Sequence, residues 1–353
     1  MTHNSGRPLY ILPFRVVVLA VAGVLLLGFL GGALASWLLV RRLVRVAPGG
    51  ERIIERVERV PVASEDTLAT VARESASSIA TLLDAAGKEL GQTVAVTADG
   101  LFVGVGAPPK APIQLRVLSG ETLPASLARV YPEGNLFFVR TSGTFSVPSI
   151  ARETLPPPGA SLAAVARSPV GSVGGRVHLV TVERMDFSGF LQETYSALTL
   201  VPMTASPLPS SFQGAPLFSA DRRLQGLALI QQDSTGVIGS PVLDFYLQDA
   251  LKHPSGVNVS VLSGLRGRPV VIQDKQEPLT VAFRVTEVAS GSPWADQDMT
   301  SGDEIQRVNG QMLTVASPLA RVLLEAARSN KPASLEIRRG AETLTRDVPV
   351  TIR

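Results

Sequence analysis

Two stretches near the C-terminus decide the fold of the last part of the chain: VTEVASGSP at 285–293 and SGDEIQRVNG at 301–310. Gly302 allows a turn that other residues resist, and the final Asn-Gly pair is typical of a tight turn between strands. Ile305 and Val308 lie between these turns, and we expect both side chains to face a core. The second stretch therefore predicts a short buried strand between two tight turns.

The segments around these stretches complete a small module. LTVAFRVTEV at 279–288 has the composition of a strand. Apolar residues at helical spacing, with a proline just before them, predict a helix over 317–329. SLEIRRG at 334–340 and TRDVPVTIR at 345–353 then predict two final strands. Together these segments indicate an α+β module at 257–353.

The middle of the chain has a different texture. Short β-rich runs separated by Gly, Pro, Ser and Asp extend from Thr93 to Gly239. Many short strands over such a length indicate an antiparallel barrel or sandwich. Just before this region, Ser64 to Leu83 has an amphipathic pattern, and we expect one helix there, with Ser64 as its N-cap.

One apolar segment near the N-terminus has the length of a membrane span. Val16 to Val40 contains 25 residues without a charge, and a helix of about 37 Å crosses a hydrocarbon core of roughly 30 Å. We expect a single-pass anchor. A cleavable signal peptide is the rival interpretation, because Ala33-Leu34-Ala35 resembles a cleavage site, but the apolar run continues beyond it. The charged segment ERIIERVER at 51–59 then predicts a stalk.

Composition excludes several classes of function. The chain has 353 residues and no cysteine, which excludes disulfides, thiol catalysis and thiolate metal sites. Its three histidines are far apart in the sequence, so we expect no metal site and no cofactor. The net charge of +3 is a small excess of basic residues, and it predicts no nucleic-acid partner.

The stretches at 285–293 and 301–310 resemble the core of a PDZ domain of the HtrA/Deg protease type, in order and spacing. The resemblance implies peptide binding through Val270, Val271 and Ile272, which follow a Gly-Arg-Pro sequence as the family's carboxylate-binding loop does. That loop usually contains a glycine, whose freedom helps to aim backbone N–H groups at a peptide carboxylate. This glycine is missing here, so strand addition is a better expectation than capture of a C-terminus.

The middle of the chain resembles the trypsin-like domain that precedes such PDZ domains. Asp99 to Val103 resembles the family's DGYILT strand, and Val165 to Gly171 its GNPFG segment. Ser211 to Phe218 (SFQGAPLF) resembles GNSGGPLF, and Leu224 to Ile230 the strand after it. The resemblance extends along the whole domain.

The resemblance places the family's catalytic positions on residues that cannot perform its chemistry. A serine protease needs a hydroxyl nucleophile, a histidine base and a carboxylate that orients the histidine. The nucleophile position falls on Gln213, the base position near Ala107 and the acid position near Asn135. Ser211 replaces the glycine that donates to the oxyanion. We interpret the chain as a pseudoprotease.

The predicted organisation is mostly β, with a small α+β domain at the end. It comprises a tail at 1–15, a transmembrane helix at 16–40 and a charged stalk at 41–65. A degenerate trypsin-like double β-barrel follows at 66–254, and a PDZ domain at 257–353.

Three classes of function stay open. The first is a module that binds peptides or unfolded segments, or that joins itself or active relatives in oligomers. The second is a serine-type endopeptidase with a displaced catalytic group. The side chains considered for it are Ser210, Ser211, His178, Lys252, His253, Lys88 and Lys110. The third is a structural component of a cell envelope. The sequence favours the first.

The orientation in the membrane has two readings. Arg41, Arg42 and Arg45 after the span outnumber Arg7 and Arg15 before it, which mildly favours a cytoplasmic C-terminal part. The family resemblance implies the opposite, with the domains outside the cytoplasm. We adopt the second.

Overall fold

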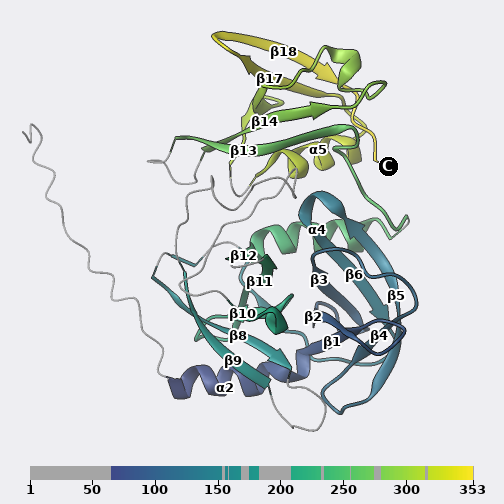
Figure 1. Cartoon of the computed structure of the whole chain (residues 1–353), viewed down its shortest axis with the longest axis vertical. Coiled ribbons are helices and arrows are strands. Elements are labelled where there is room, and N and C mark those ends of the chain that lie inside the picture. The colour runs from purple at the N-terminus through teal and green to yellow at the C-terminus, as the bar shows by residue number, and fades with distance from the viewer. Residues whose placement is uncertain are drawn as a thin grey trace, which may run out of the picture. The chain divides into compact units, whose positions relative to one another are not determined.

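The structure, a computed structural model, describes residues 65–152, 156–157, 159–167, 175–182, 208–231, 234–254, 256–273, 280–314 and 317–352. Within these residues the chain is mostly β, as Figure 1 shows. The predicted tail, transmembrane helix and nearly all of the predicted stalk fall in 1–64, outside the described residues. No helix in the described ranges is long and apolar enough to cross a membrane.

The first described elements correct the prediction of one helix from Ser64 to Leu83. The α-helix α2 spans Glu65–Ser75, the 3-10 turn η1 spans Ala76–Ser78, and the strand β1 spans Ile79–Leu83. All five residues of β1 are buried, and β1 pairs with one strand on each edge. Tertiary pairing overrides the helical pattern in these last residues, because both edges of the segment are hydrogen-bonded within a sheet.

The first β module is a closed barrel with strand order β1-β2-β3-β6-β5-β4. Its other strands are β2 Glu89–Ala95, β3 Leu101–Val105, β4 Ile113–Arg116, β5 Thr122–Tyr131 and β6 Leu136–Thr141. Apolar side chains from facing strands, including Phe102, Leu115 and Val139, fill its interior. Burial of such side chains is the main favourable contribution to folding.

The second β module is an open sheet within the described residues. Its strands are β7 Ser149–Ile150, β8 Ser161–Arg167, β9 Gly175–Thr181, β10 Pro216–Phe218, β11 Arg223–Gln231 and β12 Ser234–Gly239. Their order is β12-β11-β10-β8-β9, and β7 pairs with β11. Of the two barrels expected, the described ranges show one closed barrel and this sheet. The helix α4 Ser240–Lys252 follows it.

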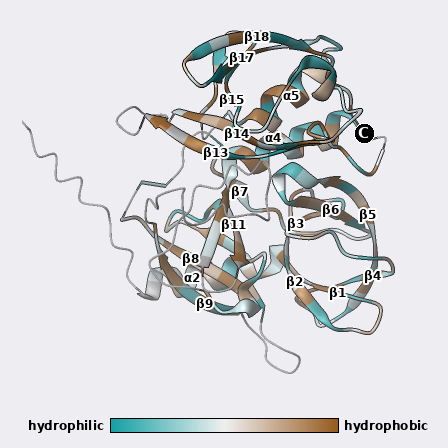
Figure 2. Cartoon of the chain, turned by 45° about the horizontal axis from the view of Figure 1, so that its top comes forward, coloured by the Kyte–Doolittle hydropathy of each residue, from teal (hydrophilic) through white to brown (hydrophobic). Residues whose placement is uncertain are grey.

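The C-terminal module has its own sheet and helix. Its elements are β13 Leu265–Gln273, β14 Thr280–Val288, η4 Ala295–Gln297, β15 Glu304–Val308, β16 Gln311–Met312, α5 Leu319–Arg328, β17 Ala333–Arg339 and β18 Glu342–Val348. The strand order is β13-β14-β15-β17-β18, with β16 on β15. In Figure 2 the edge strand β18 is largely hydrophilic, as its exposed position requires.

The predictions for the stretch at 301–310 are confirmed, whereas the last strand, expected over 345–353, is β18 at Glu342–Val348. Ile305 and Val308 are fully buried in β15. Gly302 has a φ of +96°, and Asn309 and Gly310 have φ values of +52° and +77° in the turn between β15 and β16. These left-handed values explain the Asn-Gly pair, because asparagine and glycine adopt them at low cost.

Candidate functional site

The expected nucleophile position lies just before β10 of the second β module, directly after a short turn. The 3-10 turn η3 spans Ser210–Phe212 after Pro209, and Gln213 ends it. Gly214 follows with a φ of +74°, and a Cβ there would lie 2.2 Å from the carbonyl oxygen of Gln92. Only glycine fits this backbone, because its lack of a Cβ allows both the conformation and the close approach.

Both polar atoms of the Gln213 side chain form hydrogen bonds with backbone groups of the protein. Its Oε1 accepts a hydrogen bond from the backbone N–H of Ile230 in β11, at 2.7 Å. Its Nε2 donates to the carbonyl oxygen of Val105 in β3, at 3.3 Å. Gln213 therefore ties the closed barrel to the second sheet.

A second glutamine makes the reciprocal connection. The backbone N–H of Gln92 in β2 donates to the carbonyl oxygen of Gln213, at 2.6 Å. The Oε1 of Gln92 accepts from the backbone N–H of Arg167 in β8, at 3.2 Å. We call Gln92 and Gln213 the glutamine pair. The side-chain amide of each glutamine hydrogen-bonds the backbone of the other β module. These bonds join the closed barrel to the second sheet.

The structure brings the three expected triad positions into one neighbourhood. Val105, which accepts the bond from Gln213, lies two residues before Ala107. Between them, the backbone N–H of Gly106 donates to the carbonyl oxygen of Asn135, at 2.8 Å. Ala107 is exposed and has no group that accepts a proton.

Asn135 has a local structural role. It follows the 3-10 turn η2 Pro132–Gly134 and has a left-handed φ of +46°. Asparagine tolerates this conformation better than most residues. Its Nδ2 is buried and has no hydrogen-bond partner among the described residues. The amide therefore orients no base, and its presence is explained by the backbone that it adopts.

The backbone N–H groups around Gln213 are also engaged. An oxyanion hole needs N–H groups that are free and aimed at the substrate oxygen. The N–H of Gln213 donates to the carbonyl oxygen of Ser210, at 3.0 Å, and that of Gly214 donates to Ala228, at 2.8 Å. These two donors are already used within the protein.

The side chains considered for a displaced catalytic group have other surroundings. The hydroxyl of Ser211 accepts a hydrogen bond from Nη1 of Arg176, at 3.1 Å. A guanidinium stays protonated, so it cannot act as the base for that hydroxyl. His178 lies partly exposed on β9, with its ring centroid 5.9 Å from that of Phe212. These contacts join no nucleophile to a base.

Sequence reasoning missed Gln92, Arg167 and Arg176. Arg167 ends β8 and Arg176 lies beside it on β9, and both contact the segment around Gln213 through Gln92 and Ser211. Burial, followed by the nearby charge of Arg116, lowers the pKa of Arg167. The only signal in the sequence was the unusual Arg167 in the segment that resembles GNPFG.

The expected peptide-binding residues lie on β13, at the edge of the C-terminal sheet. Val270 is half-buried, and Ile272 is 42% exposed. Val271 pairs with Val281 of β14. Among the described strands β13 has a neighbour on one side only, so its other edge offers backbone groups to an added strand.

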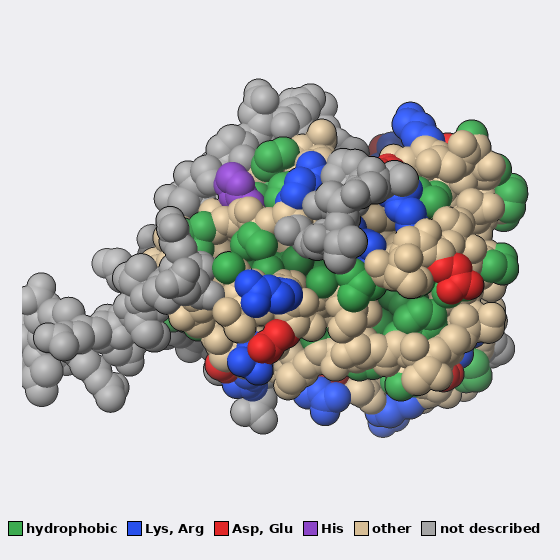
Figure 3. Space-filling model, turned by 90° about the horizontal axis from the view of Figure 1, so that it is seen from below, with side chains coloured by type: hydrophobic (Ala, Val, Ile, Leu, Met, Phe, Trp, Pro, Cys, Tyr) green, Lys and Arg blue, Asp and Glu red, His purple; other side chains and the backbone are tan. Residues whose placement is uncertain are grey.

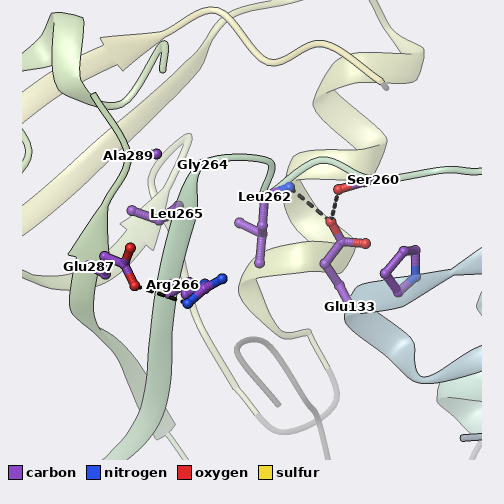
Figure 4. Close-up of a pocket in the computed structure, with 9 residues that line it drawn as sticks. Glu133, Ser260, Leu262, Gly264, Leu265, Arg266, Glu287 and Ala289 are labelled. Carbon is purple, nitrogen blue, oxygen red and sulfur yellow. Dashed lines mark hydrogen bonds and ion pairs between the residues drawn. The ribbon is translucent and has the colours of Figure 1, made fainter. Parts of the chain in front are cut away.

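A cavity of about 390 Å³ lies beside the start of β13. Figure 4 shows Glu133 from η2 on one side and the Arg266–Glu287 ion pair on the other. The Oε1 of Glu133 accepts hydrogen bonds from the N–H groups of Val261 and Leu262, at 2.9 and 3.0 Å, and from the Ser260 hydroxyl. Glu133 thus fixes the segment that leads into β13.

A second buried carboxylate, that of Asp249, accepts three hydrogen bonds from side chains. Asp249 of α4 accepts two hydrogen bonds from the guanidinium of Arg328 in α5, both at 2.8 Å, and one from the Tyr131 hydroxyl. Burial alone would raise the pKa of Asp249, but these hydrogen bonds hold it below its usual value. Burial, followed by the bond to Asp249, raises the pKa of Tyr131. This arrangement stabilises structure and is remote in sequence from the glutamine pair.

Comparisons with known proteins agree with this architecture. Residues 256–350 match the family model described as PDZ domain. A variant of the HtrA-type protease AlgW, solved with a tripeptide, has a TM-score of 0.58 and 19% identity, covering 81% of this chain and 97% of that chain. AlgW with a decapeptide has a TM-score of 0.55 and 17% identity, covering 81% and 98%.

A serine endoprotease from Yersinia pestis is also similar, with a TM-score of 0.51 and 16% identity, covering 82% of this chain and 98% of that chain. No curated protein matches the sequence. The chain therefore has an HtrA-type trypsin-like protease fold with a C-terminal PDZ domain. It is an HtrA-like protease/PDZ protein by fold.

Proposed function

We propose that this chain is a catalytically inactive HtrA-like protein that binds peptides or unfolded protein segments, or regulates active proteases of a cell envelope. One observation carries the proposal. The residue at the expected nucleophile position, Gln213, has no hydroxyl, and both of its side-chain polar atoms hydrogen-bond the backbone. An amide in that state attacks no carbonyl carbon.

Two features of the surroundings support the loss of activity. Ala107 supplies no base, and Asn135 supplies an amide in place of a carboxylate. The N–H of Gln213 donates to the carbonyl oxygen of Ser210, so this donor is not free to bind an oxyanion. Removal of a single such donor costs an active protease about 10²–10³ in rate.

Peptide binding is the activity that the fold retains. The similar AlgW structures contain a tripeptide or a decapeptide, and the PDZ domain of this chain presents the free edge of β13. We propose that an extended peptide adds to this edge, with Val270 and Ile272 beside it. Backbone hydrogen bonds supply affinity in this mode, and side-chain pockets supply selectivity.

The proposed location follows from the sequence. The apolar segment at 16–40 anchors the chain by one membrane pass, and the domains after it lie outside the cytoplasm. This orientation depends on the resemblance to membrane-anchored HtrA proteins. A membrane-impermeant reagent that modifies lysines of intact cells tests it, because Lys88 and Lys110 react only if they lie outside.

The test of inactivity is the hydrolysis of reduced, unfolded casein by the full chain in a non-ionic detergent. We expect no cleavage above background at high protein concentration, for the wild type and for Gln213→Ser alike, because the serine variant still lacks a base. Near-UV circular dichroism shows that each sample is folded. Cleavage that persists through purification and disappears in Ser210→Ala or Ser211→Ala would contradict the proposal.

A further inference from the structure

An exposed arginine on the edge strand β13 has no acidic partner. Arg266, Arg268 and Val270 are alternate residues of β13, so their side chains lie on one face of the C-terminal sheet. Arg266 pairs with Glu287 of β14, with 3.1 Å between Nη1 and Oε2. Arg268 is exposed and takes part in no ion pair among the described residues. Its positive charge therefore lacks the compensation that Arg266 has.

The residue opposite Arg268 on the neighbouring strand is another arginine. The register of β13 and β14 places Arg268 directly opposite Arg284. The Cβ atoms of directly opposite residues lie about 4.5–5.5 Å apart, and like charges at such positions are destabilising. On its β14 side, the sheet therefore gives Arg268 no favourable cross-strand partner.

The carboxylate next in the same row across the sheet is shared by two other arginines. Glu304 of β15 lies opposite Arg284 on one side and opposite Arg338 of β17 on the other. Its Oε1 accepts a hydrogen bond from Nε of Arg284, at 2.9 Å, and its Oε2 lies 3.0 Å from Nη2 of Arg338. We call Arg268, Arg284, Glu304 and Arg338 the arginine row. It carries three positive charges and one negative charge, and Arg268 forms its end at the free edge of the sheet.

We propose that the extended peptide bound at β13 carries an acidic side chain, Asp or Glu, opposite Arg268. This inference rests on the proposed function, in which a peptide adds to the free edge of β13. A strand added antiparallel places one residue opposite Arg268 on the same face, as Arg284 lies on the other side. A carboxylate there forms the opposite-charge pair that the arginine row lacks at this end. A lysine or arginine there adds a further positive charge beside Arg268 and Arg284.

The next residue of β13 on the same face defines a second position of the peptide. Val270 is half-buried and follows Arg268 by two residues. Because an antiparallel peptide runs in the opposite direction, the peptide residue that faces Val270 precedes the acidic residue by two positions. The preferred peptide therefore has an apolar residue, any residue and then an acidic residue, in that order.

General attraction between an acidic peptide and the chain must be separated from recognition at Arg268. Figure 3 shows another face of the molecule on which Lys and Arg side chains are more abundant than Asp and Glu side chains. The whole chain also has a net charge of +3. Net positive charge raises the local concentration of any anion, so a test needs variants that lose the same charge at different sites.

The test is the binding of three fluorescein-labelled peptides to the full chain, in a non-ionic detergent at low ionic strength. Their sequence is Thr-Val-Thr-Val-Thr-Glu-Thr-Ser-amide, or the same with Gln or Lys in place of Glu. The amide removes the C-terminal carboxylate, so the peptides differ only in one side chain. Fluorescence anisotropy is expected to show a Kd for the Glu peptide about two- to fivefold below that of the Gln peptide, and weaker binding of the Lys peptide.

Arg268→Gln is expected to remove the difference between the Glu and Gln peptides. Arg266→Gln and Arg140→Gln are the matched controls, because each removes one exposed arginine that already has an acidic partner, Glu287 and Asp99 respectively. Both controls are expected to keep the preference for the Glu peptide. Urea unfolding is expected to give the same midpoint for Arg268→Gln and the wild type, since the side chain is exposed.

The outcomes separate this inference from the proposed function. Equal binding of the three peptides by the wild type would overturn the acidic preference and leave peptide addition at β13 intact. The absence of binding of all three would overturn peptide addition and the acidic preference together. A preference for the Glu peptide that persists in Arg268→Gln, or that is lost equally in Arg140→Gln, would show that Arg268 does not recognise the acidic side chain.

Discussion

The backbone N–H of Gln92 donates a hydrogen bond to the carbonyl oxygen of Gln213, at 2.6 Å, where the closed barrel meets the second sheet. With the two side-chain amides, this contact places four hydrogen bonds of the glutamine pair at one boundary. We propose that the pair replaces catalytic chemistry with structural stability.

Replacement of Gln213 by alanine is expected to destabilise the protein. Gln213→Ala removes the partners of the Val105 carbonyl and the Ile230 N–H. Leaving a buried donor or acceptor unpaired costs about 1–3 kcal/mol. Urea unfolding measures this loss as a lower midpoint at an unchanged slope. Gln311→Ala, at an exposed position of β16, is the matched control, with an expected change within about 0.5 kcal/mol.

Gly214 is expected to tolerate no side chain. Gly214→Ala places a Cβ 2.2 Å from the carbonyl oxygen of Gln92 and also strains a φ of +74°. Gly340→Ala separates the two effects, because Gly340 has a φ of +62° and nothing within 4 Å of the added atom. We expect about 1–2 kcal/mol for Gly340→Ala and a larger loss for Gly214→Ala. Equal unfolding midpoints for the two variants would show that β2 does not approach Gly214 this closely.

The pH dependence of stability is expected to depend on Asp249. The pKa of this carboxyl is lower in the folded chain than its unfolded value of 3.8. A lowered pKa contributes stability that is complete above the unfolded pKa and is lost as the pH falls through the folded pKa. Asp249→Asn should therefore cost about 2 kcal/mol at pH 7, in the range for hydrogen bonds to charged groups. Its midpoint should also fall less steeply than that of the wild type below about pH 4.

The control for this experiment is Asp99→Asn. Asp99 also has a lowered pKa, chiefly through its hydrogen bonds from Thr97 and Arg140, but it is fully exposed. Its loss is expected to change the unfolding midpoint little at any pH, because exposed ion pairs contribute little. A parallel shift of the Asp249→Asn and wild-type curves over the whole acid range would contradict the role of Asp249.

Peptide binding is expected to depend on Ile272. Its side chain is 42% exposed at the edge of β13, where we propose that a peptide adds. Ile272→Asp should weaken the binding of a fluorescent apolar decapeptide by about tenfold, since a charge then opposes apolar contact, and should leave the unfolding midpoint near that of the wild type. Leu90→Asp makes the same change at an exposed site of β2. Fluorescence anisotropy that falls equally for both variants would place the peptide elsewhere.

The sequence predicted the C-terminal module well because its determinants are local. The Asn309-Gly310 turn, the buried Ile305 and Val308, and the apolar face of α5 each depend on neighbours within a few residues. The end of the first helix was wrong for the opposite reason. Ile79–Leu83 forms a strand because β2 and β4 pair with it. The sequence of this segment alone does not show that either partner strand will pair with it.

The candidate site was predicted in part. Family spacing identified Gln213, Ala107 and Asn135, and the structure brings their segments together. Family spacing could not identify Gln92 or Arg167, because their contact joins β2 to β8 across 75 residues of sequence. Likewise, the absence of the loop glycine after Pro269 could be seen in the sequence, but the pairing of β13 with β14 could not.

The most direct test of the proposed loss of catalysis is labelling with a fluorophosphonate, which forms a covalent bond only with an activated serine hydroxyl. The folded full chain is incubated with an excess of reagent, and intact mass spectrometry measures the product, with trypsin as the positive control. We predict an unchanged mass for the chain and a single adduct for trypsin. A stoichiometric adduct on the wild type, lost in Ser210→Ala or Ser211→Ala, would show an active site beside Gln213 and contradict the proposal.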